Sequence, residues 1–150
     1  MSSTDEAMSA ALALAREAAV AGEIPVGAVV LGATGERLGA GRNRREETTD
    51  PTAHAEIVAL REAAKATGSW NLSGTTLVVT MEPCVMCAGA ILQSRVTRVI
   101  FGAWDDKAGA AGSLYDVLRD RRLPYRAEVI GGVREGEAVA LLQEFFATRR

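Results

Sequence analysis

The sequence has too few cysteines, too little net charge and too short apolar runs for several classes of protein. Two cysteines could form at most one disulfide, so the chain is no disulfide scaffold and a reducing compartment is expected. No stretch of 18 uncharged apolar residues occurs, which excludes a membrane-spanning helix. Lys and Arg number 17 against 19 for Asp and Glu, and the net charge of −2 excludes a uniformly basic nucleic-acid coat. Any nucleic-acid site must be a local patch.

What remains is the composition of an ordinary globular protein. Its 150 residues are 48% apolar and 24% charged, with no internal repeat, so we expect residues 1–150 to form a single domain. The first basic residue is Arg16, and no positive start or apolar run typical of a secretory signal precedes it. A cytoplasmic protein is expected.

Hydrophobic periodicity predicts helices that alternate with short strands. The first two strands should form an antiparallel hairpin, and the third and fourth, joined by a helix, should be parallel. This order predicts an α/β fold, a three-layer αβα sandwich with a mixed five-stranded sheet. The expected helices cover residues 5–21, 53–66 (started by Asp50-Pro51), 83–94, 113–120 and 135–148; the expected strands cover 26–31, a segment ending near 41, 75–80, 96–101 and 127–130.

The only histidine and both cysteines lie in two short motifs, His54-x-Glu56 and Pro83-Cys84-x-x-Cys87. Cysteines three apart at the start of a helix share one face and meet the positive end of its dipole, which favours the thiolate form. One imidazole and two thiolates fill three of the four tetrahedral positions of Zn²⁺ and leave one for water, as in a catalytic site. Taken alone, each motif also fits a plainer reading, either a redox or buried thiol pair or a hydrogen-bonded histidine.

Glu56 has more than one possible role. It could be a fourth metal ligand or an exposed helix residue, but we favour a carboxylate that shuttles the proton of an activated water. Residues two apart on an ideal helix point about 200° away from each other. His54 and Glu56 can therefore serve one site only if the start of their helix points toward the metal.

Beyond these two motifs, the sequence resembles the bacterial tRNA-specific adenosine deaminases of the cytidine-deaminase-like superfamily. The two motifs are the signature of zinc-dependent nucleobase deaminases. The segment 109–113 and the phenylalanine-bearing C-terminal helix are more particular to the tRNA enzymes. The match covers residues 5–150, and its motifs are Asn43, 50–56, 82–90, 101–103 and 109–114.

The resemblance implies a cytidine-deaminase-like fold and hydrolysis of the wobble adenosine of tRNA to inosine, with arginine tRNA of anticodon ACG as the substrate. It implies one Zn²⁺ per subunit, held by His54, Cys84 and Cys87, and a water activated there. Glu56 would carry the water's proton to the base and help ammonia leave. The adenine would have to flip out of its stack, which costs least in an anticodon loop. The family is typically homodimeric, and no membrane is involved.

Further residues would contact the substrate by the same resemblance. Asn43 would hydrogen-bond the nucleoside, the backbone of Ala55 would meet the base edge, and Ile24 with Pro25 would wall the pocket. Asn43 could instead merely end a strand, and Ile24-Pro25 could be ordinary packing at a strand edge.

The polar residues Asp105 and Lys107 match a loop that approaches the tRNA. Of the two neighbouring phenylalanines near the C-terminus, Phe145 is assigned to the substrate. Trp104 stands where an arginine is expected and Arg42 where an aromatic is common, so both depart from the family pattern.

Basic clusters would provide the local positive face for RNA, although each could equally be scattered solvated charge. They comprise Arg42, Arg44 and Arg45, then Lys107, then Arg119, Arg121, Arg122 and Arg126, and lastly Arg149-Arg150. Two other functions compete with tRNA deamination. One is deamination of a free base or nucleotide such as guanine or cytosine, and the other is a noncatalytic, zinc-stabilised RNA-binding module.

Overall fold

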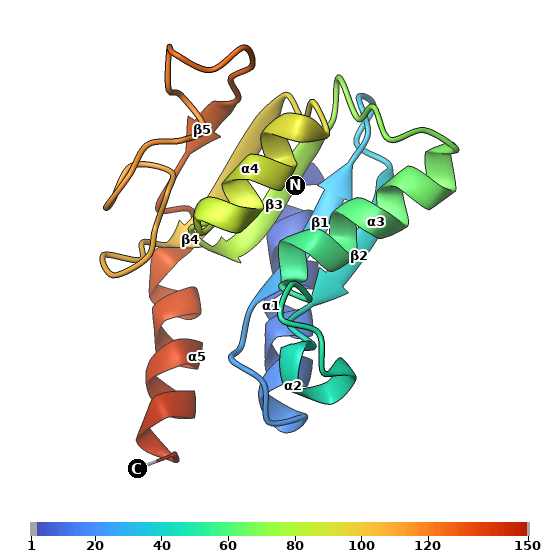
Figure 1. The fold of residues 1–150 in the computed structure, drawn as a ribbon. Helices are drawn as coiled ribbons and strands as arrows, with labels where there is room; N and C mark the ends of the chain where they lie inside the picture. Colours follow the sequence, from blue (N-terminus) through green and yellow to red (C-terminus); the bar gives the residue numbers. More distant parts are fainter. Residues whose placement is uncertain (1–2, 150) are drawn as a thin grey trace.

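A mixed sheet of five strands forms the centre of the computed structural model, which describes residues 3–149 (Figure 1). The strand order is β2-β1-β3-β4-β5; β1 is antiparallel to both of its neighbours, and β3, β4 and β5 are mutually parallel. The expected mixed sheet, antiparallel hairpin and parallel pair are confirmed. The strands are β1 (Gly27–Leu31), β2 (Arg37–Arg42), β3 (Thr76–Met81), β4 (Arg98–Ala103) and β5 (Glu128–Ile130).

Helices cover both faces of this sheet, which gives the three-layer αβα arrangement. Buried residues of α3 and α4 join one apolar cluster, and those of α1 and α5 join a second cluster on the opposite face. The helices are α1 (Ser3–Val20), α2 (Arg45–Thr48), α3 (Ala55–Thr67), α4 (Val85–Gln93) and α5 (Glu135–Ala147). No helix in the described part of the chain is both long and apolar enough to cross a membrane.

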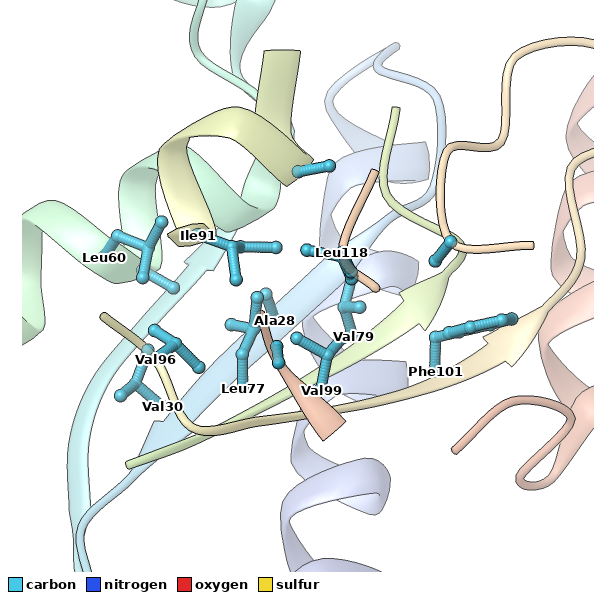
Figure 2. Close-up of a cluster of buried hydrophobic side chains, with 14 of the residues drawn as sticks. Ala28, Val30, Leu60, Leu77, Val79, Ile91, Val96, Val99, Phe101 and Leu118 are labelled. Carbon is cyan, nitrogen blue, oxygen red and sulfur yellow. The ribbon is translucent and has the colours of Figure 1, made fainter. Parts of the chain in front are cut away.

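Alternation along the central strands supplies both clusters. Leu77 and Val79 of β3 pack toward α3 and α4, whereas Val78 between them packs toward α1. Figure 2 shows Leu60 of α3 and Ile91 of α4 on the first of these faces. Both faces of the inner strands are therefore buried, as expected for strands that helices cover on both sides.

Glycines in β2 let α3 lie close to the sheet. A Cβ atom at Gly41 would lie 2.8 Å from the carbonyl oxygen of Ala55 and 2.7 Å from Cβ of Val58, which leaves no room for a side chain. A Cβ at Gly39 would crowd the backbone of Ala63 at 2.6 Å. This close packing fixes the start of α3 beside the end of β2.

The helix expected over 53–66 begins later than Asp50-Pro51 predicted. Asp50 Oδ1 instead accepts hydrogen bonds from the backbone N–H and the hydroxyl of Thr52, both at 2.8 Å, and so closes a local turn. His54 is extended, with φ −71° and ψ 156°, and α3 starts at the next residue. The helix expected from Pro83 likewise begins only after Cys84, which is also extended.

The prediction of a helix over residues 113–120 is wrong. A bridge pairs Ala111 with Asp116, and the backbone N–H of Ser113 donates to the carboxylate of Glu82 rather than to a helical carbonyl. Conversely, the short helix α2 lies between the strand expected to end near residue 41 and the helix expected over 53–66, where no helix was expected. In both places long-range hydrogen bonds decide the local structure.

Candidate active site

Three potential metal ligands converge at the starts of two helices. His54 directly precedes α3, Cys84 directly precedes α4, and Cys87 lies in the first turn of α4. The Nδ1 atom of His54 lies 3.6 Å from Sγ of Cys84 and 3.5 Å from Sγ of Cys87, and all three ligand atoms lie within 4.8 Å of one another. A tetrahedral zinc with ordinary Zn–N and Zn–S bonds separates such atoms by roughly 3.5 Å. The donor set and its spacing therefore fit Zn²⁺.

The extended backbone of His54 resolves the angular difficulty with Glu56. Since His54 precedes the helix, its direction does not follow helical geometry, and both side chains reach the same cavity. The N–H groups at the starts of α3 and α4 also face this region, and their partial positive charge favours thiolates. The start of α3 thus points toward the metal-binding residues, as the sequence required.

Glu56 is a buried residue and not an exposed helix glutamate. Its side chain lies in the first turn of α3, and the residue is 4% exposed. Burial raises the pKa of Glu56 to about 7, against the opposing effect of its hydrogen bonds. Its carboxyl group can therefore exchange a proton near neutral pH.

The two cysteines differ in their affinity for protons. A hydrogen bond from Cys87, assisted by one from His54, lowers the pKa of Cys84 to about 4. The same shared proton, together with burial, raises the pKa of Cys87. The pair thus holds one thiolate before any metal binds, and thiolates are the form that Zn²⁺ takes up.

A cavity of about 360 Å³ opens beside these residues. This is large enough for a small ligand such as a nucleobase. Of the residues assigned to substrate binding, the structure brings five to its wall, and they lie next to His54, Glu56 and Cys84. The five are Ile24, Asn43, Ala55, Asp105 and Lys107.

One wall of the cavity is the segment between β2 and α3. Asn43 Nδ2 donates to the carbonyl oxygen of Ile24 at 3.4 Å, and its Oδ1 accepts from the backbone N–H of Arg45 at 3.2 Å. The buried carboxylate of Glu23 accepts backbone N–H groups of Glu46 and Glu47 at 3.1 and 2.7 Å. These contacts organise α2 from residues about 20 positions earlier in the chain.

A second wall of the cavity is the segment after β4, which Glu82 holds. Glu82 accepts backbone N–H groups of Asp105 at 2.9 Å and of Ala111 and Ser113 at 3.0 Å each, and the hydroxyl of Ser113 also donates to it. Burial acts to raise the pKa of Glu82, but these hydrogen bonds outweigh it and leave the pKa below its ordinary value. Glu82 is therefore an ionised acceptor at neutral pH.

Two residues assigned to the substrate do not reach the cavity. Phe145 is buried, with its ring centroid 5.4 Å from that of Phe146, and Phe146, half exposed, is the one that lines the cavity. Pro25 is also absent from the lining, whereas Ile24 and its second neighbour Val26 contribute to it. The apolar stripe of α5 did not distinguish which phenylalanine faces the site.

Sequence reasoning also missed Arg45 and Leu142, both of which line the cavity. Leu142 and Phe146 are four residues apart, so they share a helix face, and this spacing could have identified the pair. The sequence marked Arg45 only as a member of a basic cluster, because its place in the cavity lining depends on the contacts that organise α2.

The two departures from the family pattern lie beside the cavity and not in its lining. The Arg42 guanidinium forms an ion pair with Glu47 at 2.8 Å. The ring of Trp104 packs edge-on against Phe101, with centroids 4.8 Å apart, and remains 46% exposed. Trp104 thus packs on the core at the end of β4.

Comparisons with known proteins show similarity to zinc-binding deaminases, which agrees with a metal site at these residues. The sequence profile of the cytidine and deoxycytidylate deaminase zinc-binding region matches residues 1–103. A tRNA-specific adenosine deaminase of Bacillus subtilis is 45% identical over 143 residues, covering 95% of this chain and 88% of that protein. A solved structure from a study of A-to-I editing by tRNA:A34 deaminases superposes with a TM-score of 0.88 at 38% identity, covering 92% of this chain and 99% of that one.

Longer proteins also contain a related segment. A tRNA(Ile)-lysidine synthase of Deinococcus radiodurans is 54% identical over 144 residues, which is 96% of this chain. The chain spans only 25% of the length of that relative.

Proposed function

This chain belongs to the cytidine and deoxycytidylate deaminase zinc-binding family, and we propose that it hydrolyses adenosine in tRNA to inosine with release of ammonia. The proposed substrate is the wobble adenosine of an arginine tRNA with the anticodon ACG. The observation that carries the proposal is the 45% identity to a tRNA-specific adenosine deaminase, which extends over 95% of this chain. The cavity beside Glu56 and the three metal-binding residues supports it.

His54, Cys84 and Cys87 would hold the ion, since their ligand atoms have tetrahedral spacing. When bound there, Zn²⁺ supplies Lewis-acid chemistry that makes a water molecule nucleophilic near neutral pH. The chain's own residues then have to place the base and move protons.

Glu56 would move the protons. Its buried carboxylate takes a proton from the attacking water and delivers it to N1 of the adenine ring, while the new bond forms between oxygen and C6. The proton of the hydroxyl now on C6 then passes by way of Glu56 to the amino group as the C6–N bond breaks, so that ammonia leaves and the C6 carbonyl of inosine remains. Its pKa of about 7 suits a group that must both accept and donate.

The cavity would hold a flipped base. Asn43 and the backbone of Ala55 offer polar contacts on one side, and Leu142 with Phe146 offers an apolar surface from α5. A base must leave its stack to reach Glu56, and an unpaired loop makes that step cheaper than a duplex does. The tRNA anticodon loop is thus the proposed partner.

We also propose a homodimer in the cytoplasm, on the strength of the resemblance. Exposed apolar side chains lie next to the site at Val85 and Met86 of α4 and at Leu114 and Tyr115. The two segments adjoin, because Cys84 pairs with Gly109 and the carbonyl oxygen of Gly109 accepts the N–H groups of Leu114 and Tyr115. A second copy would cover this apolar surface.

The decisive experiment maps inosine in arginine tRNA after incubation with wild type and with Glu56→Ala. We expect conversion of the wobble adenosine by wild type. Glu56→Ala should bind zinc and remain folded, but deaminate at least about 10²-fold more slowly, because the proton carrier is gone.

Parallel incubations with free adenosine, guanine and cytidine test the competing functions. Deamination of a free base without inosine in tRNA would replace the proposal with the free-base activity. Zinc-dependent tRNA binding without turnover on any substrate would favour the noncatalytic module. Full activity of Glu56→Ala would remove the role assigned to that residue.

A further inference from the structure

Glu82 has an unusual set of hydrogen-bond partners. It is 3% exposed, and the four donors recorded for its carboxylate all come from one later segment, residues 105–113. They are the backbone N–H groups of Asp105, Ala111 and Ser113 and the hydroxyl of Ser113. Since Glu82 lies two residues before Cys84, it connects a metal-binding residue to a segment more than 20 positions away.

The held segment forms part of the cavity. Asp105, Lys107 and Ala108 line it, and Asp105 Oδ1 accepts the backbone N–H groups of Lys107 and Ala108 at 3.1 and 3.2 Å. Glu82 therefore fixes Asp105, and Asp105 in turn fixes the turn that follows. Gly109 completes the arrangement, because a Cβ there would overlap the Glu82 carboxyl group.

Glu82 itself is not available for proton transfer or metal binding. An ionised carboxylate has about four acceptor positions, and four donors already occupy this one. Its function must then lie in the segment 105–113 that its hydrogen bonds hold in place. The loss of these charge-assisted hydrogen bonds would leave several backbone N–H groups of the wall without partners.

We propose that Glu82 is a positioning residue that sets the wall formed by residues 105–108 at a fixed place relative to the metal-binding residues. This inference rests on the proposed function for its kinetic consequence. A displaced wall no longer meets the bound nucleoside at contact distance, so the main expected consequence is weaker substrate binding and a higher KM, with a smaller effect on kcat.

The test compares Glu82→Gln, Ser113→Ala and the control Glu62→Gln, an exposed helix glutamate. An amide accepts at only one of its two terminal atoms, so Glu82→Gln loses part of the set, and Ser113→Ala removes one donor. With an RNA anticodon stem-loop, we expect Glu82→Gln to raise KM at least tenfold with a smaller change in kcat. Ser113→Ala should shift KM in the same direction by less, and Glu62→Gln should not shift it.

Two further measurements separate positioning from damage to the metal site or the fold. Zinc content and the absorption spectrum of the Co²⁺-substituted protein should be unchanged in Glu82→Gln. Backbone hydrogen exchange should accelerate over residues 105–113 and stay unchanged over α3. Altered Co²⁺ absorption, lost zinc or unchanged exchange in the segment would overturn the proposal.

The exchange measurement needs no substrate, so its result stands even if wild type fails to deaminate tRNA and the proposed function falls. If Glu82→Gln does not fold, Ser113→Ala decides the question. An unchanged KM and unchanged exchange in that variant would count against Glu82 as a positioning residue.

Discussion

Single residues at the starts of α3 and α4 form the candidate metal and catalytic site, and backbone geometry explains how they meet. His54 and Cys84 are both extended residues that precede a helix, so each side chain is directed past the helix end. The sequence motifs predicted that His54, Cys84 and Cys87 come together, and the structure confirms that they do. The depth at which Glu56 is buried could not be predicted, since it depends on segments distant in sequence.

Cys84→Ser should lose zinc and stability together. A serine hydroxyl is not ionised near pH 7 and is a poor zinc ligand, and binding free energy contributes to folding. We expect sub-stoichiometric zinc by elemental analysis and a lower melting temperature. Chelation of wild type should lower its melting temperature similarly, and added zinc should not rescue the variant. A normal zinc content in Cys84→Ser would argue against ligation by this residue.

At the scale of elements, the contact between α3 and β2 positions the site. Gly41→Ala should destabilise the protein by about 1–3 kcal/mol, because the new methyl group meets the backbone of α3. Deamination should also fall, since the start of α3 carries Glu56. The control is Gly136→Ala, in an exposed part of α5 with nothing near the added Cβ, which should raise stability by about 0.4–1 kcal/mol.

Urea unfolding and inosine formation check both variants. Equal stability of Gly41→Ala and wild type would mean that α3 can move away from the sheet without cost.

Strands were easier to predict than the segments that close the cavity. The buried runs of β1 and β3 and the parallel pairing of β3 with β4 follow from local apolar patterns. The segment 113–120 was mistaken for a helix because its hydrogen bonds go to Glu82 and across a bridge to Ala111. The helix α2 was missed for the same reason, as Glu23 organises it from outside the local sequence.

On the scale of the whole molecule, ion pairs reduce the positive charge that the basic clusters suggested. Arg42 and Arg44 both pair with Glu47, Arg119 pairs with Asp116 and Arg122 pairs with Asp120. Arg45 and Lys107 line the cavity, and neither forms an ion pair within residues 3–149. Arg45 and Lys107 thus bring positive charge to the cavity rim, where the proposed tRNA would meet it.

tRNA affinity should decrease as salt increases, with zinc content constant. Arg45→Ala and Lys107→Ala should each reduce the slope of log K against log salt by up to about 0.7, because each removes at most one contact to a single-stranded phosphate. Lys65→Ala, at the far end of α3, should leave the slope unchanged. Salt titrations of a fluorescent anticodon stem-loop measure these slopes, and a salt-independent affinity would contradict an electrostatic rim.

The connection from β4 to β5 runs between two parallel strands without a helix, through residues 104–127. Its path is irregular, and apart from core residues such as Ala110, Ala111 and Leu118 its composition can change without shifting the register of any strand. Substrate range could therefore diverge in this family by changes in the exposed part of one segment, while the catalytic frame is inherited intact. Chimeras that take this segment from a relative with another substrate should acquire a preference for that substrate. Gly109 and Ser113, which contact Glu82, would have to be kept.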